Sequence, residues 1–168
     1  RFAFNANFFY MNYKDQLVAT GKINNVGEAI MTNIPKSYRM GVEISGGAQI
    51  IEPLRWDFNV AFSKNKIKNF VMYIDNWDKS DSIAEWEYTI QDEVPMGNTN
   101  IILSPNTVAN SIFTLTPLKN FNIQLISKYV SRQYLDNTSN EYNSIDPYFV
   151  NDLKFSYGIN TDFFKSIR

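Results

Sequence analysis

Residues 53–63 read Pro-Leu-Arg-Trp-Asp-Phe-Asn-Val-Ala-Phe-Ser, and this stretch decides the class of fold. From Trp56 to Phe62 a large apolar residue occupies every second position, and the positions between them hold Asp, Asn and Ala. Successive side chains of a β-strand point to opposite faces of its sheet. A period of two therefore predicts a strand with one apolar face and one polar face. The Pro-Leu-Arg before the strand is typical of a tight turn.

The same alternation returns in four other segments of the chain. Their apolar positions are Phe2, Phe4, Ala6, Phe8 and Tyr10; Val42, Ile44, Gly46, Ala48 and Ile50; Phe121, Ile123, Leu125 and Tyr129; and Leu153, Phe155, Tyr157 and Ile159. Residues 108–115 also favour a strand, but Ile112 interrupts the polar positions and leaves the facing of this segment undetermined. The segments near 38–51 and 56–70 exceed the usual strand length of about 5 to 6 residues. We expect an all-β protein with about six long strands in an antiparallel, up-and-down sheet.

The connections between these strands alternate between short and long. Residues 52–55 and 117–120 form short turns, each followed at once by an aromatic residue. The other connections are long and polar, near residues 15–32, 75–100 and 136–146. This alternation is typical of an outer-membrane β-barrel, which has tight periplasmic turns and long outer loops. A soluble all-β domain with amphipathic strands is an alternative that the pattern leaves open.

Aromatic residues gather where the predicted strands end. Trp56 and Phe121 follow the short turns. Five tyrosines lie near the long connections: Tyr13, Tyr38, Tyr73, Tyr129 and Tyr148. Amphipathic rings favour the boundary between membrane and water, so this placement predicts aromatic girdles. Ordinary strand packing in a soluble core is the alternative.

The composition excludes several classes of function. The 16 basic and 17 acidic residues give a net charge of −1, whereas a nucleic-acid partner requires a basic excess. The absence of Cys and His removes thiol nucleophiles, Ser-His-Asp triads and imidazole metal ligands. No phosphate-binding loop or dinucleotide motif is present, and the Gly46-Gly47 pair is interpreted as a bend or a close approach of two backbones. We expect neither an enzyme nor a bound cofactor.

Several segments, taken in order along nearly the whole chain, resemble the outer-membrane TonB-dependent receptors. One is residues 32–43 (TNIPKSYRMGVE), in which Asn-x-Pro leads into Tyr-Arg-x-Gly-x-Glu. The others are residues 7–17 (NFFYMNYKDQL), 103–106 (LSPN), 127–137 (SKYVSRQYLDN) and 148–153 (YFVNDL). Their order and spacing fit the C-terminal part of the barrel of that family.

The resemblance implies a 22-stranded transmembrane β-barrel in the bacterial outer membrane, closed by an N-terminal plug domain. It implies active import of a scarce nutrient, powered by a TonB complex that acts through the plug. An iron–siderophore complex is the commonest cargo, with haem, cobalamin and glycans as alternatives. Residues 1–168 would be a single region from the late part of this barrel, about six strands, in contact with outer-membrane lipid and without the plug and the terminal strands. A soluble or surface-anchored β-rich ligand-binding module is the alternative from a different class.

The connection at residues 75–93 is strongly acidic and carries three aromatic side chains: Trp77, Trp86 and Tyr88. In a receptor these rings would stack on an aryl or sugar group of a ligand captured at the cell surface. The carboxylates do not have the spacing of an EF-hand loop, so no metal site is expected. A solvated surface loop is the alternative, since charge runs are commonly of this kind.

Charged residues also fall on the polar faces of the predicted strands. Arg39 and Glu43 share one such face, and Lys128 and Arg132 share another. In a barrel these side chains line the interior and meet the plug or the ligand. Arg39 and Arg132 offer forked guanidinium donors that suit an anionic ligand such as a ferric chelate. Structural pairing with carboxylates of the plug or of neighbouring strands is the alternative for both arginines.

Overall fold

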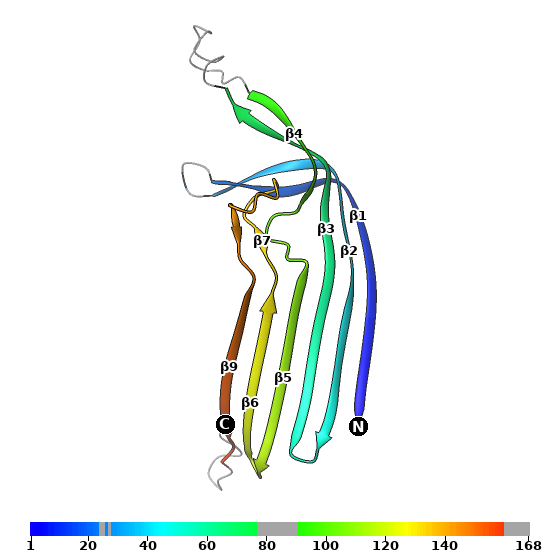
Figure 1. The fold of residues 1–168 in the computed structure, drawn as a ribbon, viewed down its shortest axis with the longest axis vertical. Coiled ribbons are helices and arrows are strands. Elements are labelled where there is room, and N and C mark those ends of the chain that lie inside the picture. Colours follow the sequence, from blue (N-terminus) through cyan, green and yellow to red (C-terminus); the bar gives the residue numbers. More distant parts are fainter. Residues whose placement is uncertain (24–25, 27, 77–90, 160–168) are drawn as a thin grey trace.

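The computed structural model describes residues 1–23, 26, 28–76 and 91–159 of the chain, which form antiparallel strands (Figure 1). The strands are β1 (Phe2–Ile23), β2 (Ala29–Ile51), β3 (Leu54–Asp75), β4 (Gln91–Asn100), β5 (Thr107–Leu118), β6 (Phe121–Val130), β7 (Gln133–Tyr134), β8 (Ser144–Ile145) and β9 (Tyr148–Tyr157). Over these ranges no helix is long and apolar enough to cross a membrane. The predicted all-β class is confirmed.

Six strands form one continuous sheet in the order β1-β2-β3-β5-β6-β9, and every neighbouring pair is antiparallel. β4 pairs with the far part of β3, beyond the end of β5, and β7 and β8 form a separate two-stranded pair. Apart from these additions, strands that are adjacent in the sheet follow one another along the chain. The up-and-down order is therefore as predicted.

The first three strands are far longer than the others, at 22, 23 and 22 residues. A strand needs only about 9 to 11 residues to cross a membrane, so these strands continue well past that length. We call the parts of these strands beyond the level of Tyr38 (residues 13–23, 29–37 and 67–75), together with β4 and the two residues that follow it, the extension. Figure 1 shows that both hairpins of the extension turn away from the sheet, at the end opposite to the short turns.

Two predicted long loops contain extended strand in their described parts, and the prediction was wrong for those residues. Residues 15–32 pair within the β1–β2 hairpin as far as Ile23 and Ala29, and residues 91–100 form β4 against β3. The physical reason is that these parts of the hairpins extend beyond the sheet. The alternation of apolar and polar residues that marks a half-buried strand is weak there, although backbone pairing continues.

The register divides the side chains of the sheet between two faces. Phe8, Val42 and Phe62 lie opposite one another in one row, and the next row holds Asn7, Glu43 and Ala61. We call the first the apolar face and the second the polar face. β5 also acquires a definite facing: Phe113 pairs with Trp56 and Asn110 with Asn59, so Ile112 lies on the polar face.

The apolar face is not covered by any described part of the chain. Its side chains are strongly exposed, for example Phe8 at 77% and Leu153 at 60%. Aromatic pairs occur at both ends of this face, with ring centroids 5.9 Å apart for Trp56 and Phe113 and 6.4 Å apart for Tyr10 and Tyr38. A contiguous apolar surface of this kind is typical of a face that meets lipid or another protein.

A small buried core lies in the extension. Its buried members come from β1, β2, β3 and the segment that follows β4: Val18, Ile34, Ile67 and Ile101. Phe70 and Ile102 pack against them. Hydrophobic burial therefore stabilises the extension, because apolar surface is removed from water there. The stability of the sheet outside the extension depends instead on the backbone hydrogen bonds between its strands and on what covers its apolar face.

Asn137, between β7 and β8, joins separate parts of the extension. Its side chain is 1% exposed, and its Nδ2 donates a hydrogen bond of 2.7 Å to the carbonyl oxygen of Ala19 on β1. Its Oδ1 accepts one of 3.0 Å from the backbone N–H of Ile102. Both ends of this buried amide are thus satisfied, and the side chain holds the β1–β2 hairpin to the segment after β4.

We predict that Asn137→Ala loosens the extension without unfolding the sheet. The substitution leaves the carbonyl of Ala19 and the N–H of Ile102, both in half-buried residues, without partners, at a cost of about 1–3 kcal/mol. Hydrogen exchange at the Ile102 amide of the full-length protein should accelerate by roughly 5- to 150-fold. The matched control is Tyr142→Ala, since this side chain is fully exposed and its loss should leave that rate unchanged. Equal rates in both variants would contradict this role of Asn137.

Candidate functional site

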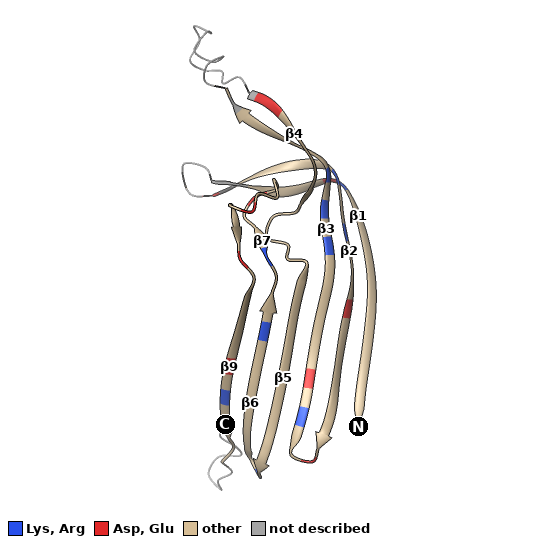
Figure 2. Cartoon of the chain, in the orientation of Figure 1, with Lys and Arg blue, Asp and Glu red and all other residues tan. Residues whose placement is uncertain are grey.

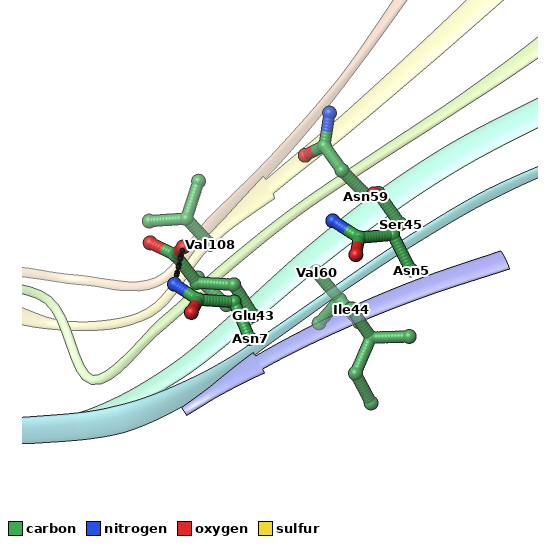
Figure 3. Close-up of a pocket in the computed structure, with 9 residues that line it drawn as sticks. Asn5, Asn7, Glu43, Ile44, Ser45, Asn59, Val60 and Val108 are labelled. Carbon is green, nitrogen blue, oxygen red and sulfur yellow. Dashed lines mark hydrogen bonds between the residues drawn. The ribbon is translucent and has the colours of Figure 1, made fainter. Parts of the chain in front are cut away.

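A hollow of about 270 Å³ opens on the polar face, across β1, β2, β3 and β5 (Figure 3). Most residues that line it belong to that face: Asn5, Asn7, Glu43, Ser45, Asn59, Ala61 and Val108. Ile44 and Val60, whose side chains lie on the apolar face, complete the lining. The polar face is therefore the hollowed side of the sheet.

Amide and carboxylate groups dominate the chemistry of this hollow. Asn7 Nδ2 donates to Glu43 Oε2 over 3.1 Å, which Figure 3 shows as a dashed line, and Asn110 Nδ2 donates to Asn59 Oδ1 over 2.9 Å. These bonds link neighbouring strands and are exposed, so water or a visiting polar group can exchange with them. The arrangement can hold a polar ligand or another protein surface by hydrogen bonds. It offers no activated nucleophile.

Arg55 and Asp57 lie nearer the short turns on the same polar face. Arg55 Nε donates to Asp57 Oδ2 over 2.6 Å, and its Nη2 donates to Oδ1 over 2.5 Å. Gly47 faces Asp57 across the β2–β3 pair, and a Cβ at this position would collide with Asp57 Oδ1. On the other face, Gly46 lies against the ring of Phe58. A Cβ at Gly46 would also meet the backbone carbonyl oxygen of Ala3, so the predicted close approach of backbones occurs at Gly46, whereas the close neighbours of Gly47 are side chains.

Arg39 lies on the polar face of β2, farther from the short turns than the hollow. It is half-buried, and its Nη1 donates a long hydrogen bond of 3.4 Å to Oδ1 of the buried Asn65 on β3. Asn65 in turn donates to Ser63 Oγ over 2.9 Å. Glu43 is about 14 Å along the strand from Arg39, since the two are separated by four residues of about 3.4 Å each. The guanidinium group therefore stands between the hollow and the extension.

Arg132 follows β6 and has two carboxylate partners. Its Nη1 lies 3.1 Å from Glu141 Oε2, and its Nη2 lies 3.1 Å from Asp146 Oδ1. Desolvation lowers the pKa of Arg132, but Glu141 and Asp146 outweigh it and raise this pKa above its ordinary value. Both carboxylates belong to the connection between β7 and β9, so Arg132 ties that connection to the end of β6. Arg132 and Arg39, the two arginines predicted to bind ligand, therefore share no partner.

The predicted aromatic residues Trp77, Trp86 and Tyr88 lie outside the described residues. The structure describes the edges of that acidic connection, where Asn76 Nδ2 donates to Asp92 Oδ2 over 2.7 Å. Among the described residues, no three acidic side chains gather closely enough to hold a metal ion.

Sequence reasoning missed two features, one on the polar face and one in the extension. The contact between Asn59 and Asn110 joins residues far apart in the chain, and only the register of β3 against β5 reveals it. Asn137 carries no local signal at all, because asparagine is common in loops. Amides at alternate strand positions were an available clue to the contact between Asn59 and Asn110. No such clue pointed to Asn137.

The sequence matches the family model described as TonB dependent receptor-like, beta-barrel over residues 1–168. No curated protein matches the chain. Solved structures that resemble it include the siderophore receptor PiuA from Acinetobacter baumannii, with a TM-score of 0.62 at 14% identity over 95% of this chain and 20% of that one.

Two further similar structures are receptors for siderophores by their descriptions. PirA from Acinetobacter baumannii has a TM-score of 0.55 at 16% identity over 93% of this chain and 23% of its own. A mutant of the ferric enterobactin receptor PfeA from Pseudomonas aeruginosa, in complex with enterobactin, has a TM-score of 0.54 at 15% identity over 92% and 21%. The chain thus spans about a fifth of the length of the receptors that it resembles. By its two-faced antiparallel sheet and by the family model that covers it throughout, this chain belongs to the TonB-dependent receptor β-barrels.

Proposed function

We propose that residues 1–168 form part of the barrel wall and outer loops of a receptor that imports a ferric siderophore across the bacterial outer membrane. The observation that carries this proposal is the division of one sheet into an exposed apolar face and a hollowed polar face. The apolar face is suited to lipid, and the polar face is suited to an aqueous interior that holds a plug and passes a ligand.

The architecture supports the direction of transport. All the long extensions stand at one end of the sheet, and the short turns between β2 and β3 and between β5 and β6 stand at the other. In outer-membrane barrels the long loops face outward. The extension is accordingly the part that would meet a ligand first, and the short turns would face the periplasm and the TonB complex, which would act through the plug.

The similar structures support the cargo and the place of the chain in the barrel. PiuA and PirA are described as siderophore receptors, and PfeA as a ferric enterobactin receptor. Six paired strands are about a quarter of a 22-stranded barrel, in accord with a chain that spans about a fifth of these receptors. We assign the chain to the late part of the barrel because of the order of its motifs.

The exposed apolar face counts against the alternative of a soluble β-rich module. A soluble protein would leave Phe8, Leu153 and their neighbours in water at a cost of about 25 cal/mol for each Å² of apolar surface. Within the proposed receptor, Arg39 and the three aromatic residues at 77, 86 and 88 would contact the ligand. For Arg132, the pairs with Glu141 and Asp146 favour the structural role.

The first test is uptake by cells that lack the full-length protein. We expect them to lose import of one radiolabelled ferric siderophore, and cells that lack TonB should lose the same import. The protein should be recovered in the outer membrane and increase under iron starvation. Loss of cobalamin or glycan import instead would identify that nutrient as the cargo. Recovery of the protein in a soluble fraction would refute its assignment to a membrane barrel.

Arg39→Ala should weaken ferric siderophore binding by roughly 10- to 100-fold, because a hydrogen bond to a charged group contributes about 1.5–3 kcal/mol. Arg39→Lys keeps the charge but loses the forked geometry, so it should recover only part of the affinity. The measurement is quenching of intrinsic tryptophan fluorescence in the purified full-length receptor. The control is Lys154→Ala, a cation on the polar face of β9. Affinity unchanged by Arg39→Ala would remove this residue from the ligand site.

Arg132→Ala should instead affect the outer loops. Removal of the guanidinium group frees the connection between β7 and β9 from the end of β6. Limited proteolysis of intact cells should then cut near residues 136–146 several times faster, while the surviving receptor binds ligand normally. A large loss of affinity without faster cleavage would assign Arg132 to the ligand site.

A further inference from the structure

Five lysines gather on the apolar side of the sheet, just beyond its last apolar row. Lys64 pairs with Met40 and Lys66 with Tyr38, and both pairs continue the face that carries Phe62. Lys14 and Lys36 lie directly opposite each other on the next row. We call Lys14, Lys36, Lys64, Lys66 and Lys68 the outer lysine patch.

Two observations, one contact and one pattern of burial, determine the face on which this patch lies. The Nζ atom of Lys68 lies 5.4 Å from the centroid of the Tyr38 ring, which shares its face with Val42. Ser37 and Ile67, the sequence neighbours of Lys36 and Lys66, are fully buried on the opposite side. Since successive side chains of a strand alternate, the lysines point away from the polar face.

The depth of the patch follows from strand geometry. Leu54 begins β3 at the short turn, and Lys64 is about ten residues farther along, or about 33 Å. A tilt of about 40° reduces this to about 25 Å, the height of the apolar band of a membrane barrel. The stacked pair of Tyr10 and Tyr38 lies at the same level as Lys64 and Lys66, where interfacial aromatic residues belong. The patch therefore stands at the outer boundary of the membrane.

Apart from the contact of Lys68 with the Tyr38 ring, the charges of the patch have no partners in the described part of the chain. None of the five lysines forms an ion pair there. Like charges directly opposite each other on paired strands are destabilising, and Lys14 and Lys36 are placed in this way. Figure 2 shows basic residues gathered on β3 below the point where its tip turns away. An anion at this position would relieve the repulsion.

We propose that the outer lysine patch binds the phosphate groups of an anionic glycolipid in the outer leaflet. This inference rests on the proposed function for its membrane. The row immediately below the patch is Phe8, Val42 and Phe62, with Phe62 51% exposed. A ligand here meets cations above and apolar rings below, which matches a phosphorylated head group above acyl chains. A soluble anion would gain only the first contact.

The test uses the full-length receptor in detergent, with bisphosphorylated lipid A as the probe. The triple variant Lys36→Gln/Lys64→Gln/Lys66→Gln should bind this lipid roughly 10- to 100-fold more weakly than the wild type, since each surface lysine contributes up to about fivefold. The matched control is Lys119→Gln/Lys128→Gln/Lys154→Gln, which removes the same charge elsewhere and should change affinity by less than about threefold. The corresponding triple Lys→Arg variant should retain binding.

Specificity and folding are controlled separately. Dephosphorylated lipid A should bind weakly to all variants, and millimolar inorganic phosphate should not displace the phosphorylated lipid. Displacement by phosphate, or equal binding by the patch variant and the wild type, would overturn the inference. Heat-dependent gel mobility establishes that each variant is folded, and the single variant Lys64→Gln replaces the triple variant if needed. Absence of the wild-type protein from the outer membrane would refute the proposed function instead.

Discussion

The register between β2 and β3 is the constraint on which the remainder of the sheet depends. A slip of one residue would turn Phe58 and Phe62 toward the interior and place Asp57 on the apolar face. On the lipid face of a barrel, Arg and Lys cost about 2–4 kcal/mol at the midplane, whereas acidic side chains and positions nearer the interface cost less. β1 and β5 pair with these two strands and take their facing from them. The hollow, the Arg55–Asp57 pair and the outer lysine patch all follow from one alignment.

The two halves of the molecule are stabilised by different means. Between the level of Tyr38 and the short turns the sheet has almost no buried side chains. Its exposed apolar face is therefore stabilised only by an apolar environment around it. Beyond that level the extension has its own core around Ile67 and its own buried amide at Asn137. This division allows the outer part to vary in sequence and shape while the wall keeps its alternating pattern. It also explains why Arg39, a candidate ligand residue, and Val42 on the apolar face belong to the same strand, β2.

The alternation of apolar and polar residues was sufficient to predict the strands of the six-stranded sheet, but it was insufficient to predict the extension. The strand that contains Trp56 and Phe58 was readable because one of its faces carries apolar side chains and the other polar ones. β4 was not readable, since neither of its faces carries that contrast. The facing of β5 required its pairing with β3, because Ile112 on the polar face and Ser111 on the apolar face contradict a simple alternation. Asn137 and the Asn59–Asn110 contact depend on distant partners that no local pattern encodes.

The bond between Asn137 and Ala19 closes a loop of 118 residues. Contacts between residues so far apart form late in folding, because the entropy of closing the loop must be overcome first. Neighbouring strands, in contrast, pair through turns as short as the one between Leu118 and Phe121. The sheet can consequently pair hairpin by hairpin, and the contact that holds the extension forms only after β6 and β7 have been added. Assembly of the barrel and ordering of its outer surface are thus separate kinetic events.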